Sequence, residues 1–349
     1  MTRASQNDSN RISNTCTIGN LYLCHVVRVA RTRHRGRGEG VSPTTWGSIP
    51  SDILPNVEKV RQLNQEGKHG DLRKGEAAAG AFTRYAPFYD AEQHGNLLAR
   101  WTRARNLHVL RDTFGAGARV LEIGCGTGEE ALYLASRGVE VLATDAAEGM
   151  IEVLSAKLAA GKMGRDSGGL VSTRVLAARD IGLLVAEYGR ASLSGAYSSF
   201  GPLNCEPDLR PVVAGLTELV APGGKVVISL LNRYCAWETI WHLARLQPRT
   251  AFRRWGGYAE ATVRAAWGER RIPVYYWTAG TAERLFSPHF SITRRSALTW
   301  ALPPPYLERL VRHGPDHFRR LARWELRLAH RWPFNVAGDH ILLEMVRKP

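Results

Sequence analysis

The sequence predicts an α/β protein with a doubly wound, mostly parallel sheet, and three observations support this fold class. Apolar runs of strand length alternate with helix-like segments between residues 120 and 231. Short turns that contain glycine or proline connect these segments. A glycine-rich turn, residues 124–128, joins the first strand directly to the first helix. Such alternation is typical of a parallel sheet with helices packed on both faces.

The first strand, turn and helix have the composition of a cofactor cradle. Residues 120–123 read Val-Leu-Glu-Ile, a short buried strand, and residues 129–136 are rich in helix formers, with Glu129 and Glu130 in the first turn. The glycines carry no Cβ and therefore let a ligand approach the backbone. The first amides of the helix point into the same space.

Glu122, the acid inside this strand, helps to decide which kind of cofactor the turn would bind. A dinucleotide fold requires G-x-G-x-x-G, whereas this chain has Glu122 followed by Gly124, Gly126 and Gly128. The segment resembles the first motif, E/D-x-G-x-G-x-G, of the class I S-adenosylmethionine-dependent methyltransferases. Their cofactor carries a sulfonium and an ammonium and no phosphate, so an added carboxylate suits it. We therefore favour this family over a nicotinamide site or a purely structural turn.

The later strands follow the same pattern. The second strand, residues 139–144, ends at Asp145, where a carboxylate can accept both ribose hydroxyls of either cofactor. Residues 148–160 are expected to be a helix, 171–177 the third strand, 193–200 the fourth, 209–220 a helix and 226–231 the fifth strand. The Pro-Gly-Gly turn at 222–224 is another feature that the family shows.

The resemblance implies a set of cofactor contacts. Asp180, at the end of the third strand, would take the exocyclic amine of adenine, although a helix N-cap is the ordinary role of such an acid. Met150 would lie beside adenine or simply in the core. The residues predicted to contact S-adenosylmethionine are Glu122, Gly124, Cys125, Gly126, Gly128, Asp145, Ala146, Met150, Asp180, Ile181 and Ser198.

The end of the fourth strand bears on the methyl acceptor. Amino-directed DNA and protein methyltransferases carry an Asp/Asn-Pro-Pro-aromatic tetrad there, and this chain has Ser198-Ser199-Phe200-Gly201 instead. This argues against that subgroup and leaves oxygen, carbon or other small-molecule acceptors. Phe200 and Asn204 are candidate substrate contacts, with turn chemistry as the alternative for Asn204.

An aromatic segment precedes the first strand. Residues 85–90 read Tyr-Ala-Pro-Phe-Tyr-Asp, which is similar to a segment that lies across the cofactor pocket in this family, and residues 96–110 have the pattern of an amphipathic helix. Tyr85 and Tyr89 are therefore further substrate candidates, or they cap the sheet. No general base can be assigned, because His94, His242 and His289 are candidates by location only.

The resemblance also implies the whole topology. The family has a Rossmann-like seven-stranded sheet of order 3-2-1-4-5-7-6, with strand seven antiparallel. Residues 290–298 would be strand six and 339–346 the last strand, while 274–278 looks like a short strand or cap segment. We expect residues 1–78 to be a disordered basic extension and 79–349 one methyltransferase domain, with a cofactor-binding core at 118–231 and helical and aromatic cap elements within 232–349.

The positive charge lies outside the predicted cofactor core. The chain has a net charge of +15, yet residues 105–231 hold 12 Lys and Arg against 14 Asp and Glu. Residues 232–335 hold 18 against 7, together with eight of the ten tryptophans. Such a region could be a solvated face, a substrate cap or an RNA-binding surface. Phe318, Leu321, Trp324 and Leu328 recur at helical spacing there, which favours a surface helix with its arginines in water.

The remaining composition narrows the function classes. Five widely spaced cysteines predict neither a disulfide framework nor a metal site, and no run approaches the ~20 apolar residues of a membrane span. We expect a cytoplasmic enzyme with no membrane partner, which transfers a methyl group from S-adenosylmethionine to an oxygen or carbon of a small molecule. The alternatives are an RNA methyltransferase or a module that binds the cofactor without catalysis.

Overall fold

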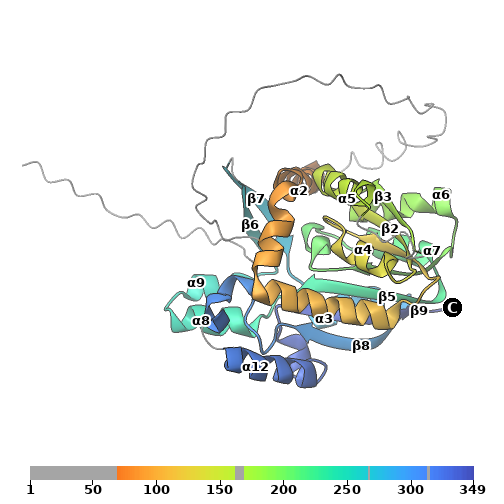
Figure 1. Ribbon diagram of the computed structural model, residues 1–349. Coiled ribbons are helices and arrows are strands. Elements are labelled where there is room, and N and C mark those ends of the chain that lie inside the picture. Colours follow the sequence, from red (N-terminus) through yellow and green to blue (C-terminus); the bar gives the residue numbers. More distant parts are fainter. Residues whose placement is uncertain (1–68, 162–168, 266–267, 313–314) are drawn as a thin grey trace, which may run out of the picture.

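The computed structural model describes residues 69–161, 169–265, 268–312 and 315–349. These residues form a seven-stranded sheet of order β3-β2-β1-β4-β5-β9-β8 and a separate two-stranded hairpin, β6-β7 (Figure 1). The predicted fold class and strand order are therefore confirmed, with β8 and β9 as the predicted sixth and seventh strands.

Five parallel strands form the side of the sheet that carries the glycine turn. β1 is central and pairs in parallel with β2 and β4. Their bounds are β1 Arg119–Ile123, β2 Glu140–Asp145, β3 Val171–Val175, β4 Leu193–Ser198 and β5 Val220–Leu231. Because all five run in the same direction, their carboxyl ends meet at one edge of the sheet, which is where ligands bind in open α/β folds.

The last strand reverses the direction of the sheet. β9 (His340–Arg347) runs antiparallel to both β5 and β8 (Phe290–Leu298). His340 pairs with Leu231, so the beginning of β9 lies beside the carboxyl end of β5. Two segments that are distant in sequence therefore meet at the ligand-binding edge.

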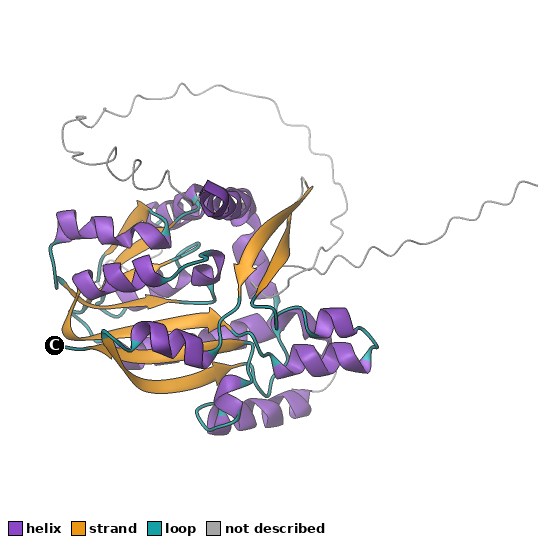
Figure 2. Ribbon diagram, turned by 180° about the vertical axis from the view of Figure 1, so that it is seen from behind, coloured by secondary structure: helices purple, strands orange, loops and turns teal. Residues whose placement is uncertain are grey.

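Helices cover both faces of the sheet, as Figures 1 and 2 show. On one face, η2, α7 and α10 pack on apolar side chains such as Leu121 and Ile228. On the other face, α3, α4 and α5 pack on Val120 and Val141. Their bounds are α3 Leu97–Thr113, α4 Glu129–Ala135, α5 Glu148–Ala159, η2 Ala178–Leu184, α6 Val185–Tyr188, η3 Pro202–Cys205, α7 Arg210–Leu219 and α10 Ala279–Phe286.

A long helix and the hairpin form an outer layer that the sequence pattern predicted only in part. α2 (His69–Gly95) begins ten residues before the predicted domain boundary and continues through Pro87. Its Ala81 and Tyr85 pack in one apolar cluster with side chains of β6 (Tyr258–Ala265) and β7 (Gly268–Tyr275). Only the first two residues of the segment 274–278, predicted as a short strand or cap segment, lie in a strand, because β7 begins at Gly268 and ends at Tyr275.

The remaining helices extend the C-terminal half beside the sheet. They are α8 (Ala236–Ala244), α9 (Pro248–Ala251), η4 (Pro305–Leu307), α11 (Arg309–Arg312), α12 (Pro315–Leu328) and η5 (Phe334–Val336). α12 packs on α3 through Phe318 and Leu321, as its spacing predicts, but Trp324 is exposed and Glu325 is buried instead. None of the helices in the described ranges combines the length and the apolar character needed to cross a membrane.

Candidate functional site

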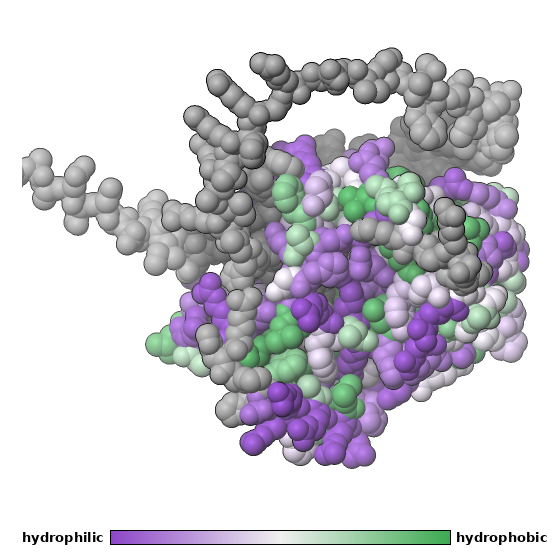
Figure 3. All heavy atoms as spheres, viewed as in Figure 1, coloured by the Kyte–Doolittle hydropathy of each residue, from purple (hydrophilic) through white to green (hydrophobic). Residues whose placement is uncertain are grey.

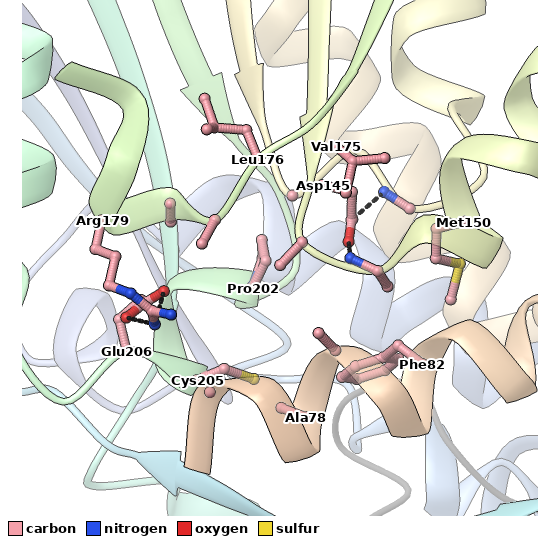
Figure 4. Close-up of a pocket in the computed structure, with 18 of the residues that line it drawn as sticks. Ala78, Phe82, Asp145, Met150, Val175, Leu176, Arg179, Pro202, Cys205 and Glu206 are labelled. Atoms are coloured by element: carbon pink, nitrogen blue, oxygen red, sulfur yellow. Dashed lines mark hydrogen bonds and ion pairs between the residues drawn. The ribbon is translucent and has the colours of Figure 1, made fainter. Parts of the chain in front are cut away.

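A cavity of about 350 Å³ lies at the carboxyl edge of the parallel strands. Figure 4 shows α2 on one side of it, carrying Ala78 and Phe82, and the end of β3 with Leu176 on the other. The glycine turn and the segment after β4 complete the wall. The volume is at the lower end of what small-molecule sites in proteins occupy.

The glycine turn forms an open part of this wall. Gly124, Gly126 and Gly128 have φ values of +72°, +53° and +80°, a region that side chains with a Cβ rarely adopt. A Cβ on Gly124 would lie 2.2 Å from the Pro202 side chain, whereas one on Gly126 would have no neighbour within 4 Å. Gly126 therefore leaves free space beside the backbone, which a ligand could fill.

Asp145 joins the glycine turn to the next helix. Its Oδ2 accepts a hydrogen bond of 2.8 Å from the Gly126 amide, and its Oδ1 accepts one of 2.8 Å from the Ala147 amide (Figure 4). Burial raises the pKa of this carboxyl, and the two amide hydrogen bonds oppose that shift. Asp145 lines the cavity, and each of its oxygens can accept a second hydrogen bond.

The ends of β2 and β3 supply the predicted nucleoside contacts. Ala146, Met150 and Asp180 all line the cavity, beside Val175 and Leu176. Burial raises the pKa of the Asp180 carboxyl, and the neighbouring Arg179 opposes the shift. The apolar residues and the acid that were predicted to contact adenine therefore lie in the wall of the same cavity.

Glu122 lies outside the cavity wall. Its side chain is 1% exposed, and neither carboxyl oxygen has a hydrogen-bond partner of standard geometry among the described residues. Burial raises the pKa of Glu122 well above its usual range, and the carboxyls of Glu130 and Asp145 raise it further. Arg103 lies 2.9 Å from Glu130 and partly offsets these negative charges.

Four other residues that were predicted to contact the cofactor do not line the cavity. Cys125, in the glycine turn, and Ile181, in η2, are buried in the apolar clusters on the two faces of the sheet. Ser198 donates to the carbonyl of Ile123, and its neighbour Ser199 lines the cavity instead. A Cβ on Gly128 would lie 2.2 Å from Leu154, so this glycine serves helix packing.

Asn204, predicted to contact substrate, makes only backbone hydrogen bonds in the structure. Its Nδ2 donates to the carbonyls of Leu231 and Tyr275, and its Oδ1 accepts from the Leu231 amide. It therefore fastens the end of β5 to β7, and it does not line the cavity.

The aromatic candidates divide in the same way. Tyr85 is buried in the cluster between α2 and the hairpin, and its hydroxyl donates to Glu92. Tyr89 and Phe200 line the cavity. Burial raises the pKa of Tyr89 to about 12, so its hydroxyl stays protonated near neutral pH. Phe200 has φ +61°, and non-glycine residues held in this region tend to mark functional sites.

Several lining residues carried no signal in the sequence. The ion pair between Arg179 and Glu206, 3.3 Å apart, lies in the wall near the start of α2 (Figure 4). A Cβ on Gly75 would lie 2.7 Å from the Arg179 guanidinium. Gly75, Phe82, Pro202 and Cys205 also line the cavity. None of the three candidate histidines is among its lining residues.

A buried ion pair holds α2 over the cavity. The Lys157 ammonium on α5 lies 2.7 Å from Asp90 on α2 and 2.6 Å from Glu129 on α4. Asp90 also accepts a hydrogen bond of 2.5 Å from Thr127 in the glycine turn. Although burial opposes it, these partners lower the pKa of Asp90. An ion pair connects α2 to α5, and a hydrogen bond connects α2 to the glycine turn.

Comparisons with known proteins show which families the sequence resembles. Residues 120–224 match the family model described as a methyltransferase domain. The chain is 33% identical over 139 residues to a ubiquinone biosynthesis O-methyltransferase of Xanthomonas axonopodis pv. citri, covering 38% of this chain and 54% of that protein. It is 35% identical over 121 residues to the protein of the same name from Xylella fastidiosa strain 9a5c, covering 35% of this chain and 45% of that protein. The matches thus span about half the length of these relatives.

Solved structures with similar chains include a putative S-adenosylmethionine-dependent methyltransferase from Listeria monocytogenes. Its TM-score is 0.48 at 15% identity, over 72% of this chain and 99% of that one. An S-adenosylmethionine-dependent methyltransferase from Mesorhizobium loti has a TM-score of 0.43 at 16% identity, over 71% and 98% of the two chains.

Proposed function

We propose that the protein is a class I S-adenosylmethionine-dependent methyltransferase that methylates an oxygen of a small organic acceptor. Two findings support this proposal: residues 120–224 match a methyltransferase domain, and the sheet has the strand order expected for that family. The observation that most supports a nucleoside cofactor, on which the proposal depends, is the position of Asp145. Its carboxylate lies in the cavity wall and is tied by hydrogen bonds to both the glycine turn and the following helix. The acid that would hold a ribose is thereby fixed in place before any ligand binds.

The lining residues suit a cationic nucleoside. We assign Asp145 to the ribose hydroxyls, Asp180 to the adenine amine, and Ala146 and Met150 to the adenine faces. The open space beside Gly126 would admit the amino-acid end. Glu122 supplies a carboxyl behind the turn, and a bound cation would lower its raised pKa again.

S-adenosylmethionine supplies an activated methyl group on its sulfonium, so the chain's own residues have mainly to align the acceptor and exclude water. Tyr89, Phe200 and Phe82 provide aromatic surface for a planar acceptor. The Tyr89 hydroxyl, with its pKa at about 12, can donate a hydrogen bond but is a poor base near neutral pH. The names of the relatives support oxygen as the atom methylated.

Two measurements test the proposal. Calorimetric titration with S-adenosylmethionine and S-adenosylhomocysteine should show binding at one site. Incubation with methyl-labelled S-adenosylmethionine and a panel of hydroxylated aromatic compounds should then transfer label to an oxygen. Binding without transfer to any acceptor would favour a non-catalytic module, and absence of binding would contradict the proposal altogether.

Nucleic acid is the competing acceptor class, because the net charge is +15. Transfer of label to RNA, with affinity that falls steeply as salt rises, would support that alternative. Transfer to a small phenol that is insensitive to salt would exclude RNA as the preferred acceptor.

A further inference from the structure

Exposed apolar side chains gather on α8, α9 and the segment that follows them. We define the α8–α9 patch by six of these residues, each at least 41% exposed: Ile240, Leu243, Leu246, Phe252, Trp255 and Tyr258. In Figure 3, hydrophobic atoms reach the surface at the left-hand edge, where Figure 1 labels α8 and α9. Single exposed apolar residues are ordinary, but a contiguous group of them marks an interaction surface.

Leu246 is the most exposed member of the patch. It lies in the turn between the two helices, and its exposed fraction is 90%. Its φ is +57°, a conformation that costs free energy for any residue with a Cβ. A glycine or asparagine would relieve this strain and avoid the exposed side chain. The fold therefore presents a leucine to solvent at the tip of a turn.

The patch rests on a fixed support. The Trp255 ring packs edge-to-face against Phe252 at 4.9 Å between centroids and against Tyr234 at 5.2 Å. Beneath these rings, the buried Arg254 guanidinium lies 2.6 Å from Glu238 on α8 and 2.8 Å from Asp339 at the start of β9. The patch is thus attached to the carboxyl edge of the sheet, which is also the edge that holds the cavity.

The stretch of chain that forms most of the patch carries positive charge. No acidic residue lies between Glu238 and Glu260, and Glu238 is buried against Arg253 and Arg254. Arg245 and Arg249 are exposed in the same stretch. The Arg245 guanidinium lies 4.2 Å from the centre of the Trp241 ring. Aliphatic tips, aromatic rings and flanking arginines together suit the interface of a membrane with anionic headgroups.

We propose that the α8–α9 patch docks the protein on the surface of a membrane that contains anionic lipids. Leu246 and Ile240 would enter the headgroup boundary, and Arg245 and Arg249 would face the lipid phosphates. The sequence prediction of no membrane partner rested on the lack of a spanning segment, which surface binding does not require. Docking is independent of the methyl transfer proposed above.

Other occupants fit the charge less well. A second copy of the chain, placed symmetrically, would bring arginines against arginines. Residues 1–68 hold ten Lys and Arg against five Asp and Glu, so that segment carries the same sign as the patch. RNA would match the charge and could stack on Trp255, but Ile240, Leu243 and Leu246 are exposed aliphatic side chains that RNA would leave in water.

The test is flotation of the full-length protein with vesicles. Phosphatidylcholine vesicles containing about a third phosphatidylglycerol should carry the wild-type protein upward, and pure phosphatidylcholine vesicles should carry several-fold less. Leu246→Asp and Ile240→Asp should each lower partitioning roughly tenfold. Arg245→Ala together with Arg249→Ala should lower binding to the anionic vesicles only.

Leu183→Asp is the matched control, because Leu183 is 56% exposed and lies in η2, beside α6 and away from α8 and α9 in Figure 1. This variant should float like the wild type. Equal flotation of the wild type and Leu246→Asp would overturn the proposal, since binding would then come from another basic segment. A change of oligomeric state in Leu246→Asp by light scattering, with no vesicle binding in the wild type, would assign the patch to a second copy. Binding to single-stranded RNA without binding to vesicles would overturn it as well.

Discussion

Asp145 is the residue on which the assigned ribose contact depends. Its carboxylate holds the Gly126 and Ala147 amides, so a substitution changes both the ligand contact and the shape of the turn. We expect Asp145→Ala to weaken S-adenosylmethionine binding by about 1–3 kcal/mol, and Asp145→Asn to weaken it less because one oxygen acceptor remains. Calorimetry measures both. Glu152→Gln, which alters an exposed carboxylate on α5, should bind the cofactor normally.

Asp339 makes the stability of the protein sensitive to acid. Burial alone would raise the pKa of this carboxyl, but Arg254 and His340 overcome that effect and lower it from 3.8 to about 2. Because the folded value is below the unfolded one, the stabilisation is present above about pH 4 and is lost as the pH falls toward 2. The shift corresponds to about 2 kcal/mol.

Denaturant unfolding of the wild type and Asp339→Asn checks this. The variant should be less stable at pH 7 by about 2 kcal/mol, because the charged partner is lost while Arg254 keeps Glu238. The difference between the two proteins should narrow as the pH falls below 4. If the difference in the free energy of unfolding stays constant with pH, the Asp339 ion pair does not make stability depend on pH.

At the scale of elements, α2 is held over the cavity by Asp90, Lys157 and Thr127. Asp90→Asn keeps the size of the side chain but removes its charge, so α2 should leave the glycine turn more readily. We expect hydrogen exchange to become faster in residues 75–90 and the dissociation rate of the cofactor to rise several-fold. Asp112→Asn, an exposed acid at the end of α3, is the control and should change neither rate. Unchanged exchange in Asp90→Asn would mean that apolar packing alone positions α2.

The elements that could be predicted from sequence are those whose pattern is local. β1 to β5 and their helices follow from apolar runs separated by glycine turns, and β8 and β9 from the family resemblance. The β6-β7 hairpin was missed although polar and apolar residues alternate in β6 from Ala259 to Ala265. Three of the four apolar positions there are alanines, and alanine is depleted in strands. Pro273 within β7 also argues against a strand.

Some residues of the site could also be predicted from local sequence, and others could not. Asp145, Asp180 and Gly126 could be predicted because each is placed by the end of its own strand. The contact of Gly75 with Arg179 joins residues that are far apart in the chain, and nothing local to either residue indicates it. Whether Ser198 or Ser199 faces the cavity depends on the direction of one residue at a strand end, which the sequence pattern does not determine.

At the scale of the whole molecule, the N-terminal boundary of the part of the chain that forms the cavity lies within α2. Gly75, Glu76, Ala78 and Ala79 line the cavity, although the predicted domain began at residue 79. Removal of residues 1–68 should therefore leave cofactor affinity unchanged, and removal of residues 1–80 should lower it at least tenfold, because part of the wall is lost. Calorimetry on both truncated proteins, each checked for folding by circular dichroism, tests this. Equal affinities would show that the first turns of α2 contribute nothing to binding.

The packing of α2 against the β6-β7 hairpin also affects the order in which parts of the molecule can fold during synthesis. α2 leaves the ribosome early, but the apolar surface formed by Ala81 and Tyr85 has no hairpin to cover it until residue 275 has been synthesised. The five parallel strands are complete by Leu231, well before that point. Until then α2 can pack on Ala147 and Met150 of the α5 region, but the part of its apolar surface that the hairpin covers stays exposed in the nascent chain.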